Sequence, residues 1–271
     1  MTNMRIAIAG VTGRMGKKLI QSLPHIEGIV LGAAFVRPGS IVTGIDVGQV
    51  VGEKILGIKL IDNLNTAIND FDVLIDFTNP AATLTYIDFC CKYKKSMVIG
   101  TTGFTEYEKK KIFLASENIS IVLSPNFSVG INVVIKLLEK ITTVMGNYAD
   151  IEIIESHHRN KRDAPSGTAL AMGEAIANIM HWDLNKKAIY NRGIHSGKRL
   201  ANTIGFATIR AGDIIGEHTA IFADIGERIE ITHKASSRIT FAHGALKAAI
   251  WVNNKKPGIY SMQDVLALST L

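Results

Sequence analysis

The glycine pattern of segment 10–16, GVTGRMG, constrains the fold more than any other feature of this sequence. It follows the apolar segment 5–9, whose β-branched residues are typical of a strand. The apolar residues after it recur at the spacing of one helix face as far as Leu23, and segment 29–35 is apolar again. The order strand, glycine turn, helix, strand predicts the first unit of a Rossmann-type, doubly wound parallel α/β sheet.

The same glycines predict a nucleotide site. Their spacing is GxxGxxG rather than the commoner GxGxxG. The physical role is similar, because glycines permit a tight turn and a close approach of phosphate to the backbone. The helix that follows supplies free N–H groups and the positive end of its dipole. We therefore expect a dinucleotide at this turn.

The end of the second strand bears on which dinucleotide binds. NAD-binding sheets usually carry an acid there, which holds the ribose hydroxyls. Here the strand runs from Ala33 into Val36 without an acid, and Arg37 follows. A cation at this place suits a 2′-phosphate, so the sequence favours NADPH, with NADH also possible. The alternative is that Arg37 is a solvated loop residue.

Strands and helices keep alternating along the first half of the chain. Apolar strands are expected over 73–77, 97–99 and 119–123, with helices between them. The strands end in the turns FTNP, GTTG and SPNF. In open α/β sheets, ligands bind at the carboxyl ends of the strands, so these turns and GVTG could line one cofactor groove. Taken singly, each could be only a turn.

After Gly146 the pattern changes, which predicts a second domain of α+β type with a mixed sheet. A strand over 151–156 and a helix over 165–180 come first, and helices over 241–252 and 262–268 end the chain. Between them we expect three antiparallel strands, over 203–211, 219–223 and 228–233. The expected limits are 1–128 with 238–271 for the dinucleotide domain and 129–237 for the second domain.

Composition excludes several other classes of protein. The net charge is +6, but the cations are spread along the chain and lack the interleaved aromatic residues of single-strand binders. No apolar run of about 18 residues predicts a membrane helix, and no signal peptide is evident. Cys90 and Cys91 are adjacent, which fits buried thiols better than a disulfide. We expect a cytoplasmic protein that binds neither nucleic acid nor membrane.

The segment from Glu155 to Thr168, ESHHRNKRDAPSGT, concentrates titratable and cationic side chains before a helix start. Its consecutive histidines would point to opposite faces of a strand, and no further ligand set accompanies them, so no metal is predicted. Acid–base work explains the histidines beside Lys161 better, and the cations would attract a carboxylate-bearing substrate. Asp163 either orients Lys161 or caps the loop. Ser166 can cap the helix while the same turn binds a carboxylate.

Motifs along essentially the whole chain resemble one family, the 4-hydroxy-tetrahydrodipicolinate (dihydrodipicolinate) reductases of bacterial lysine biosynthesis. They are IAGVTGRMG, VLIDFTNP, VIGTTGF, NFSVGIN, EIIESHHRNKRDAPSGTAL, GFATIRAGDIIGEHT and ITHKASSR. The resemblance implies an NADPH- or NADH-dependent reductase of a cyclic dicarboxylate. It also implies a second domain that binds substrate and builds a homotetramer through its mixed sheet.

The resemblance also implies roles for particular residues. His157 matches the proton donor or acceptor and Lys161 the second proton donor, while His158, Gly167 and Thr168 match substrate-binding positions. The implied cofactor contacts are Gly10, Val11, Thr12, Gly13, Arg14, Met15, Arg37, Gly100, Thr101, Thr102, Ser124, Pro125, Asn126 and Phe127. The chain departs from the family where Val36 replaces a common acid, and at Ser124 and Pro125, where two alanines are common.

Overall fold

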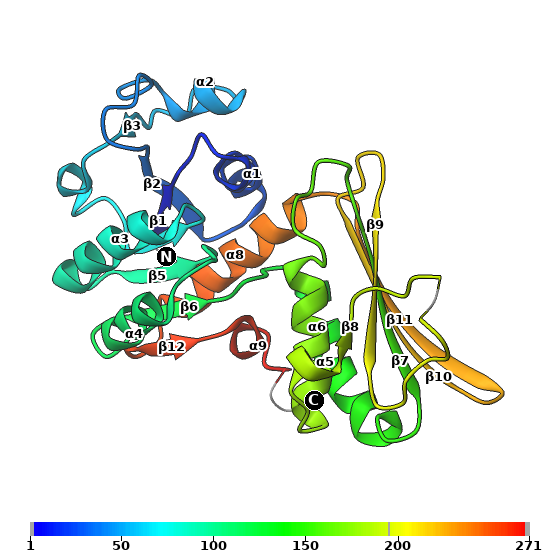
Figure 1. The fold of residues 1–271 in the computed structure, drawn as a ribbon. Helices are drawn as coiled ribbons and strands as arrows, with labels where there is room; N and C mark the ends of the chain where they lie inside the picture. Colours follow the sequence, from blue (N-terminus) through cyan, green and yellow to red (C-terminus); the bar gives the residue numbers. More distant parts are fainter. Residues whose placement is uncertain (1–2, 195, 269–271) are drawn as a thin grey trace. The chain divides into compact units, whose positions relative to one another are not determined.

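The computed structural model describes residues 3–194 and 196–268, which form two compact units (Figure 1). The first unit runs to Val129 and resumes from Arg238 to Leu268, and the second is Gly130–Ser237. The predicted domain limits also take in residues 1, 2, 195 and 269–271, which lie outside the described residues. Within the described residues, every helix is too short or too polar to cross a membrane.

A seven-stranded sheet forms the centre of the first unit. Its strands are β1 (Met4–Ala9), β2 (Ile29–Phe35), β3 (Leu60–Ile61), β4 (Val73–Asp76), β5 (Ser96–Ile99), β6 (Ser120–Leu123) and β12 (Gly258–Tyr260). They lie in the order β12-β6-β5-β4-β1-β2-β3, and each neighbouring pair is parallel. The series 3-2-1-4-5-6 is the Rossmann order. This confirms the predicted fold class.

Helices cover both faces of this sheet, and each face has its own apolar core (Figure 1). They are α1 (Arg14–Ser22), η1 (Leu23–His25), α2 (Val47–Val51), η2 (Leu64–Ala67), α3 (Pro80–Tyr93), α4 (Glu106–Ala115), α8 (Ile239–Val252) and α9 (Met262–Val265). Helices α1, α2 and α8 pack on one face, and α3 and α4 with η2 pack on the other. Burial on both faces explains why the strands are continuously apolar.

The helix expected over 262–268 is shorter than predicted. α9 ends at Val265, and Ala267 has a φ of 53°, a left-handed conformation that an α-helix cannot include. Leu268, beyond the end of α9, is nonetheless buried, which explains the apolar spacing that continues past Val265.

A five-stranded mixed sheet forms the second unit, in the order β11-β10-β7-β9-β8. The strands are β7 (Asp150–His157), β8 (Ala188–Ile189), β9 (Ile204–Arg210), β10 (Gly216–Asp224) and β11 (Glu227–Ala235). The helices are α5 (Val129–Met145), α6 (Gly167–Ile179) and α7 (Leu184–Lys187). Helices α5 and α6 pack on one face of the sheet around a single apolar core.

The direction of one strand corrects the sequence prediction of three antiparallel neighbours. β10 is antiparallel to both β7 and β11, but β9 lies on the far side of β7 and is parallel to it. The chain passes through α6 between β7 and β9, and such a crossover is what a parallel pair requires. β7 therefore has both kinds of neighbour.

Short polar residues define where the helices start. The side chains of Asn79, Thr105 and Ser166 each accept a backbone N–H at the start of α3, α4 and α6, respectively. Helix α1 differs, because its N-cap is Gly13 and no side chain among the described residues caps it. The N–H groups of its first turn are therefore available to a ligand.

Gly244 provides a test of how tightly α8 packs. A Cβ atom at this position would lie 1.8 Å from the carbonyl oxygen of Phe127. In an open helix Gly→Ala would stabilise by roughly 1 kcal/mol. Here we expect Gly244→Ala to lower the free energy of unfolding by about 1–3 kcal/mol, because the backbone must shift. Gly193→Ala, whose Cβ would meet nothing within 4 Å, is the matched control. Urea unfolding measures both, and equal stabilities would contradict the packing described.

Candidate active site

The strand-end turns of the first unit contact one another. The backbone N–H of Thr78, after β4, donates to Thr101 Oγ1, after β5, at 3.0 Å. A Cβ on Gly10, after β1, would lie 2.8 Å from the Thr78 methyl group. The turns GVTG, FTNP and GTTG therefore form a continuous edge of the sheet, as expected for a cofactor groove.

Asp76, the last residue of β4, holds the turn after its own strand and contacts helix α3. It is fully buried, and its Oδ1 accepts the Thr78 N–H at 2.9 Å and the Thr78 hydroxyl at 2.6 Å. Its other oxygen accepts from the hydroxyl of Thr83 on α3. Burial raises the pKa of Asp76, and the hydrogen bonds from Thr78 and Thr83 offset part of this effect. Sequence reasoning missed this residue, although an acid ending an apolar strand indicates such a hub.

The glycine turn fits a phosphate group. A Cβ on Gly16 would lie 2.5 Å from the carbonyl oxygen of Gly10, and one on Gly13 would lie 3.1 Å from it. Side chains at either place would push the turn away from α1. Thr12, Gly13 and Arg14 are exposed at the uncapped start of α1. A pyrophosphate can therefore approach backbone N–H groups here, as the glycine pattern predicts.

The other predicted cofactor positions divide by exposure. The exposed ones are Arg37, Thr102 and Pro125, the half-buried ones are Met15, Gly100 and Asn126, and the buried ones are Val11, Thr101, Ser124 and Phe127. Phe127 packs edge-on against Phe77, with ring centroids 5.3 Å apart. A Cβ on Gly100 would lie 2.0 Å from the Phe77 ring. The buried members therefore shape the backbone of the groove, and the exposed ones offer side chains.

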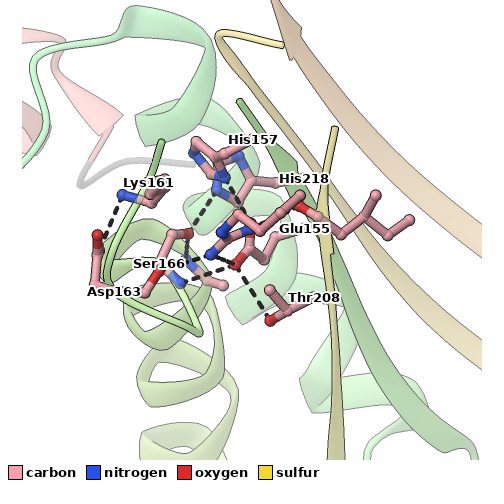
Figure 2. A network of polar contacts seen from close by, with 10 residues as sticks. Glu155, His157, Lys161, Asp163, Ser166, Thr208 and His218 are labelled. Carbon is pink, nitrogen blue, oxygen red and sulfur yellow. Dashed lines mark hydrogen bonds and ion pairs between the residues drawn. The ribbon is translucent and has the colours of Figure 1, made fainter. Parts of the chain in front are cut away.

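Glu155 is the centre of the polar network in the second unit (Figure 2). Its side chain is 1% exposed and lies on β7. It accepts two hydrogen bonds from the guanidinium of Arg210 on β9, at 2.7 and 2.9 Å. It also accepts from the backbone N–H of Ser166 at 3.1 Å and from the hydroxyl of Thr208 at 3.3 Å. Burial works to raise the pKa of Glu155, but the bonds from Arg210 and His157 outweigh it and lower that pKa.

His157, the last residue of β7, donates to this carboxylate. Its Nδ1 lies 2.5 Å from Glu155 Oε2. Because the carboxylate is ionised and can only accept, the proton resides on Nδ1 and Nε2 keeps its lone pair. Burial lowers the pKa of His157, Glu155 offsets part of this, and Lys161 and Arg210 lower it further. A Cβ on Gly216 would lie 3.0 Å from Nε2, so this glycine leaves the ring its space.

A second histidine, His218 on β10, lies beside the first. The two rings stand at 75° with centroids 5.1 Å apart. His218 Nε2 is 3.0 Å from the hydroxyl oxygen of Ser166, which also accepts the Ala169 N–H at the start of α6. Burial, followed by the charge on His157, lowers the pKa of His218 to about 3. His218 is therefore a neutral contact between β10 and the helix start.

Lys161 lies on the loop that leaves β7. Its ammonium group pairs with Asp163 at 2.9 Å and its side chain is 20% exposed (Figure 2). It is close enough to lower the pKa values of both His157 and His218. Asp163 therefore orients Lys161, one of the two roles considered from the sequence. An ammonium and an imidazole beside each other provide a proton donor and a proton acceptor.

The predicted substrate-binding residues flank this pair. His158 follows His157 directly and is half-buried, and its carbonyl oxygen accepts the Lys161 N–H at 3.1 Å. Gly167 is exposed and Thr168 half-buried in the first turn of α6. The structure thus places all five predicted residues of this segment, including His157 and Lys161, around one loop and one helix start.

Sequence reasoning missed Glu155, Arg210 and His218 as site residues. The signal was period-two alternation, since Glu155 and His157 share one face of a strand. The register places Thr208 and His218 opposite Glu155, and Arg210 opposite His157. Sequence alone did not reveal that β7 lies between β9 and β10, and without that order the residues could not be brought together.

The lowered histidine pKa values predict acid sensitivity of the second unit. A lowered pKa contributes stability that is complete above the unfolded pKa, about 6.5, and is lost as pH falls through the folded value. Stability should therefore decrease below about pH 6.5 by up to ~1.4 kcal/mol per pH unit for each histidine. His218→Asn should make this slope shallower. Fluorescence of Trp182 in a Trp251→Phe background reports unfolding of the second unit. An equal dependence of the free energy of unfolding on pH with and without His218→Asn would contradict a lowered pKa for His218.

Two family models match the chain. "Dihydrodipicolinate reductase, N-terminus" matches residues 4–127, and "Dihydrodipicolinate reductase, C-terminus" matches residues 130–266. The first match contains the strand-end turns GVTG, FTNP and GTTG, and the second contains Glu155, His157 and Lys161.

Solved structures share the fold. A dipicolinate-bound dihydrodipicolinate reductase from Paenisporosarcina sp. TG-14 is 24% identical, with a TM-score of 0.75 over 97% of this chain and 99% of that chain. An amine dehydrogenase from Mycobacterium smegmatis is 11% identical, with a TM-score of 0.62 over 96% and 95%. GenD2 of gentamicin A biosynthesis, in complex with NAD, is 12% identical, with a TM-score of 0.61 over 99% and 91%.

Because the sequence identities are low, these solved structures show only that the fold is shared, with an NAD(P)-binding Rossmann-like first unit. The family models are specific to sequence, and together they account for nearly every described residue. This chain therefore belongs to the dihydrodipicolinate reductase family.

Proposed function

We propose that this chain reduces 4-hydroxy-tetrahydrodipicolinate to tetrahydrodipicolinate, with loss of water, in lysine and diaminopimelate biosynthesis in the cytoplasm. The observation that carries the proposal is the Glu155–His157 pair beside Lys161, in a segment that the family's C-terminal model matches. The relative from Paenisporosarcina binds dipicolinate, which supports a cyclic dicarboxylate as the ligand.

NADPH or NADH would supply the hydride when bound. The residues proposed to hold it are the glycine turn, the GTTG turn and the segment Ser124–Phe127. The turn would receive the pyrophosphate at the start of α1. Arg37 is exposed beyond β2, and the end of this strand carries no acid of its own, which favours NADPH. Asp76 would keep the Thr78 and Thr101 turns in the shape that the cofactor requires.

His157 and Lys161 would manage protons. The Glu155 carboxylate holds the His157 proton on Nδ1, so Nε2 can accept one. Lys161 carries the proton that the reduced ring takes up together with the hydride, and Asp163 keeps the ammonium in place. A positioned acid and base of this kind typically accelerate a proton transfer by about 10²–10⁴-fold.

The helix start at Ser166 and the adjoining cations would bind the substrate carboxylates. Gly167 and Thr168 lie in the first turn of α6, where N–H groups and the helix dipole favour an anion. His158 is adjacent to the proposed proton acceptor. Arg159, Lys161 and Arg162 add positive charge to the same loop, which attracts a doubly negative molecule.

The uncovered face of the mixed sheet supports a homotetramer. Helices α5 and α6 pack on one face of this sheet, and among the described residues no helix covers the other. Strand alternation places Ile154, Ile209 and Ile221 on that second face, and Ile209 is 47% exposed. Exposed apolar groups of this kind mark protein interfaces. We expect light scattering to give four times the 29.4 kDa chain mass.

The direct test is a spectrophotometric assay with freshly generated substrate and each nicotinamide cofactor. We expect oxidation of NADPH and, more weakly, of NADH, only when this substrate is present. A panel of amino acids, keto acids and other dicarboxylates identifies a reductase of different specificity. Binding of cofactor without oxidation by any substrate would reject the enzymatic proposal and leave a dinucleotide sensor.

Replacing Lys161 should separate chemistry from cofactor binding. Lys161→Met should lower kcat about 10²–10⁴-fold, the range for a lost general acid. The Kd for NADPH, measured by fluorescence titration, should stay unchanged. Arg162→Met removes the same charge from the same loop and is the matched control: it should raise KM for the substrate, because it weakens attraction of the carboxylates, but change kcat little. Equal kcat losses in both variants would indicate that only the charge of the loop matters.

A further inference from the structure

A cavity of about 430 Å³ opens in the first unit between the ends of β2 and β3 and the helix α3. Its walls are largely apolar and aromatic, with Phe35 and Val36 on the sheet side and Tyr86 and Phe89 on the helix side. This volume lies within the range of small-molecule sites, roughly 300–1,000 Å³. A largely apolar, aromatic cavity at the carboxyl ends of parallel strands suits the adenosine half of a dinucleotide.

Asp62 is the one acid among the residues that line this largely apolar cavity, beside the polar side chains of Asn63, Asn65 and Thr85. It directly follows β3, which pairs in parallel with β2 so that Phe35 lies opposite Ile61. The Val36 N–H donates to the Ile61 carbonyl at 2.9 Å, which continues the alignment by one step. Asp62 is therefore level with Val36, the place where NAD-binding sheets carry their acid on the second strand. An acid that β2 lacks therefore lies directly after the neighbouring strand β3.

The Asp62 carboxylate has acceptor capacity left. Its Oδ2 accepts the N–H of Gly39 at 3.1 Å, which links it to the loop that carries Arg37. Its Oδ1 accepts no hydrogen bond from the described residues. Asp62 is half-buried, whereas Arg37 is exposed and has no ion pair within the described part of the chain. An anionic acceptor and a free cation thus flank the end of β2.

We propose that Asp62 is the acceptor for an adenosine ribose hydroxyl and acts against Arg37, the cation already proposed to favour a 2′-phosphate. The inference rests on the proposed function, because it concerns the same dinucleotide. The two residues act in opposite directions. Asp62 can bind the 2′-hydroxyl of NADH and repels the 2′-phosphate of NADPH, whereas Arg37 attracts that phosphate. Together they let one chain accept both cofactors.

Calorimetry on the full chain tests this without catalysis. The ligands are NADH and NADPH, and ADP-ribose and 2′-phospho-ADP-ribose, which lack the nicotinamide. Asp62→Asn should raise the Kd for NADH and for ADP-ribose about tenfold, which is the effect of losing one hydrogen bond to a charged acceptor. The same variant should bind NADPH and 2′-phospho-ADP-ribose with an unchanged or lower Kd. Arg37→Met should raise the Kd for NADPH and for 2′-phospho-ADP-ribose about tenfold and leave the Kd values for NADH and ADP-ribose unchanged.

Glu27→Gln is the matched control, because it removes one exposed negative charge before the opposite end of β2. It should leave all four affinities unchanged. Thermal unfolding of each variant checks that the unit remains folded. An equal loss for both cofactors in Asp62→Asn would overturn the inference and reduce Asp62 to a support for the Gly39 loop. No change would overturn it as well. In either case substrate-dependent oxidation by the unchanged chain would still stand, so the two proposals fail separately.

Discussion

The buried carboxylate of Glu155 is the interaction on which the second unit depends. It joins β7 to β9 through Arg210 and Thr208, and to the start of α6 through the Ser166 N–H. Breaking a buried ion pair from one side typically costs about 3–5 kcal/mol, because a charge is left without a partner. The same carboxylate fixes which nitrogen of His157 carries the proton. Fold and chemistry therefore share one group, and Glu155 cannot change without affecting both.

The first unit also contains a buried carboxylate that accepts several hydrogen bonds. Asp76 ends β4 as a fully buried carboxylate, and its acceptor capacity is taken up by the turn after its own strand and by Thr83. In both units a strand therefore carries an acid into the core near its carboxyl end, where loops would otherwise be free to move. Hydrogen bonds to a buried anion are worth more than those between neutral groups. Rigid loops of this kind suit a site that must hold a ligand in one orientation.

Much of the fold followed from the sequence, and the failures have physical causes. Period and turn residues predicted the parallel sheet, because strands buried on both faces and glycine turns leave a strong local signal. The parallel placement of β9 beside β7 and the early end of α9 left no such signal. Sequence alone suggested candidate residues of the second unit only where they are contiguous, as in the segment from His157 to Thr168. Arg210 and His218 come from other strands, and their roles depend on pairing that local pattern does not encode. The position of Asp62 level with Val36 likewise depends on the pairing of β3 with β2, which the sequence did not reveal.

The protonation state of His157 tests this account most directly. Nitrogen-15 imidazole spectra of histidine-labelled protein, recorded from pH 5 to 8 and assigned with a His157→Gln variant, report both the tautomer and the pKa. The structure predicts a neutral ring at pH 7 with its proton on Nδ1, and protonation only below the ordinary value of about 6.5. A proton on Nε2 in the neutral ring, or a pKa above that value, would contradict the role given to Glu155.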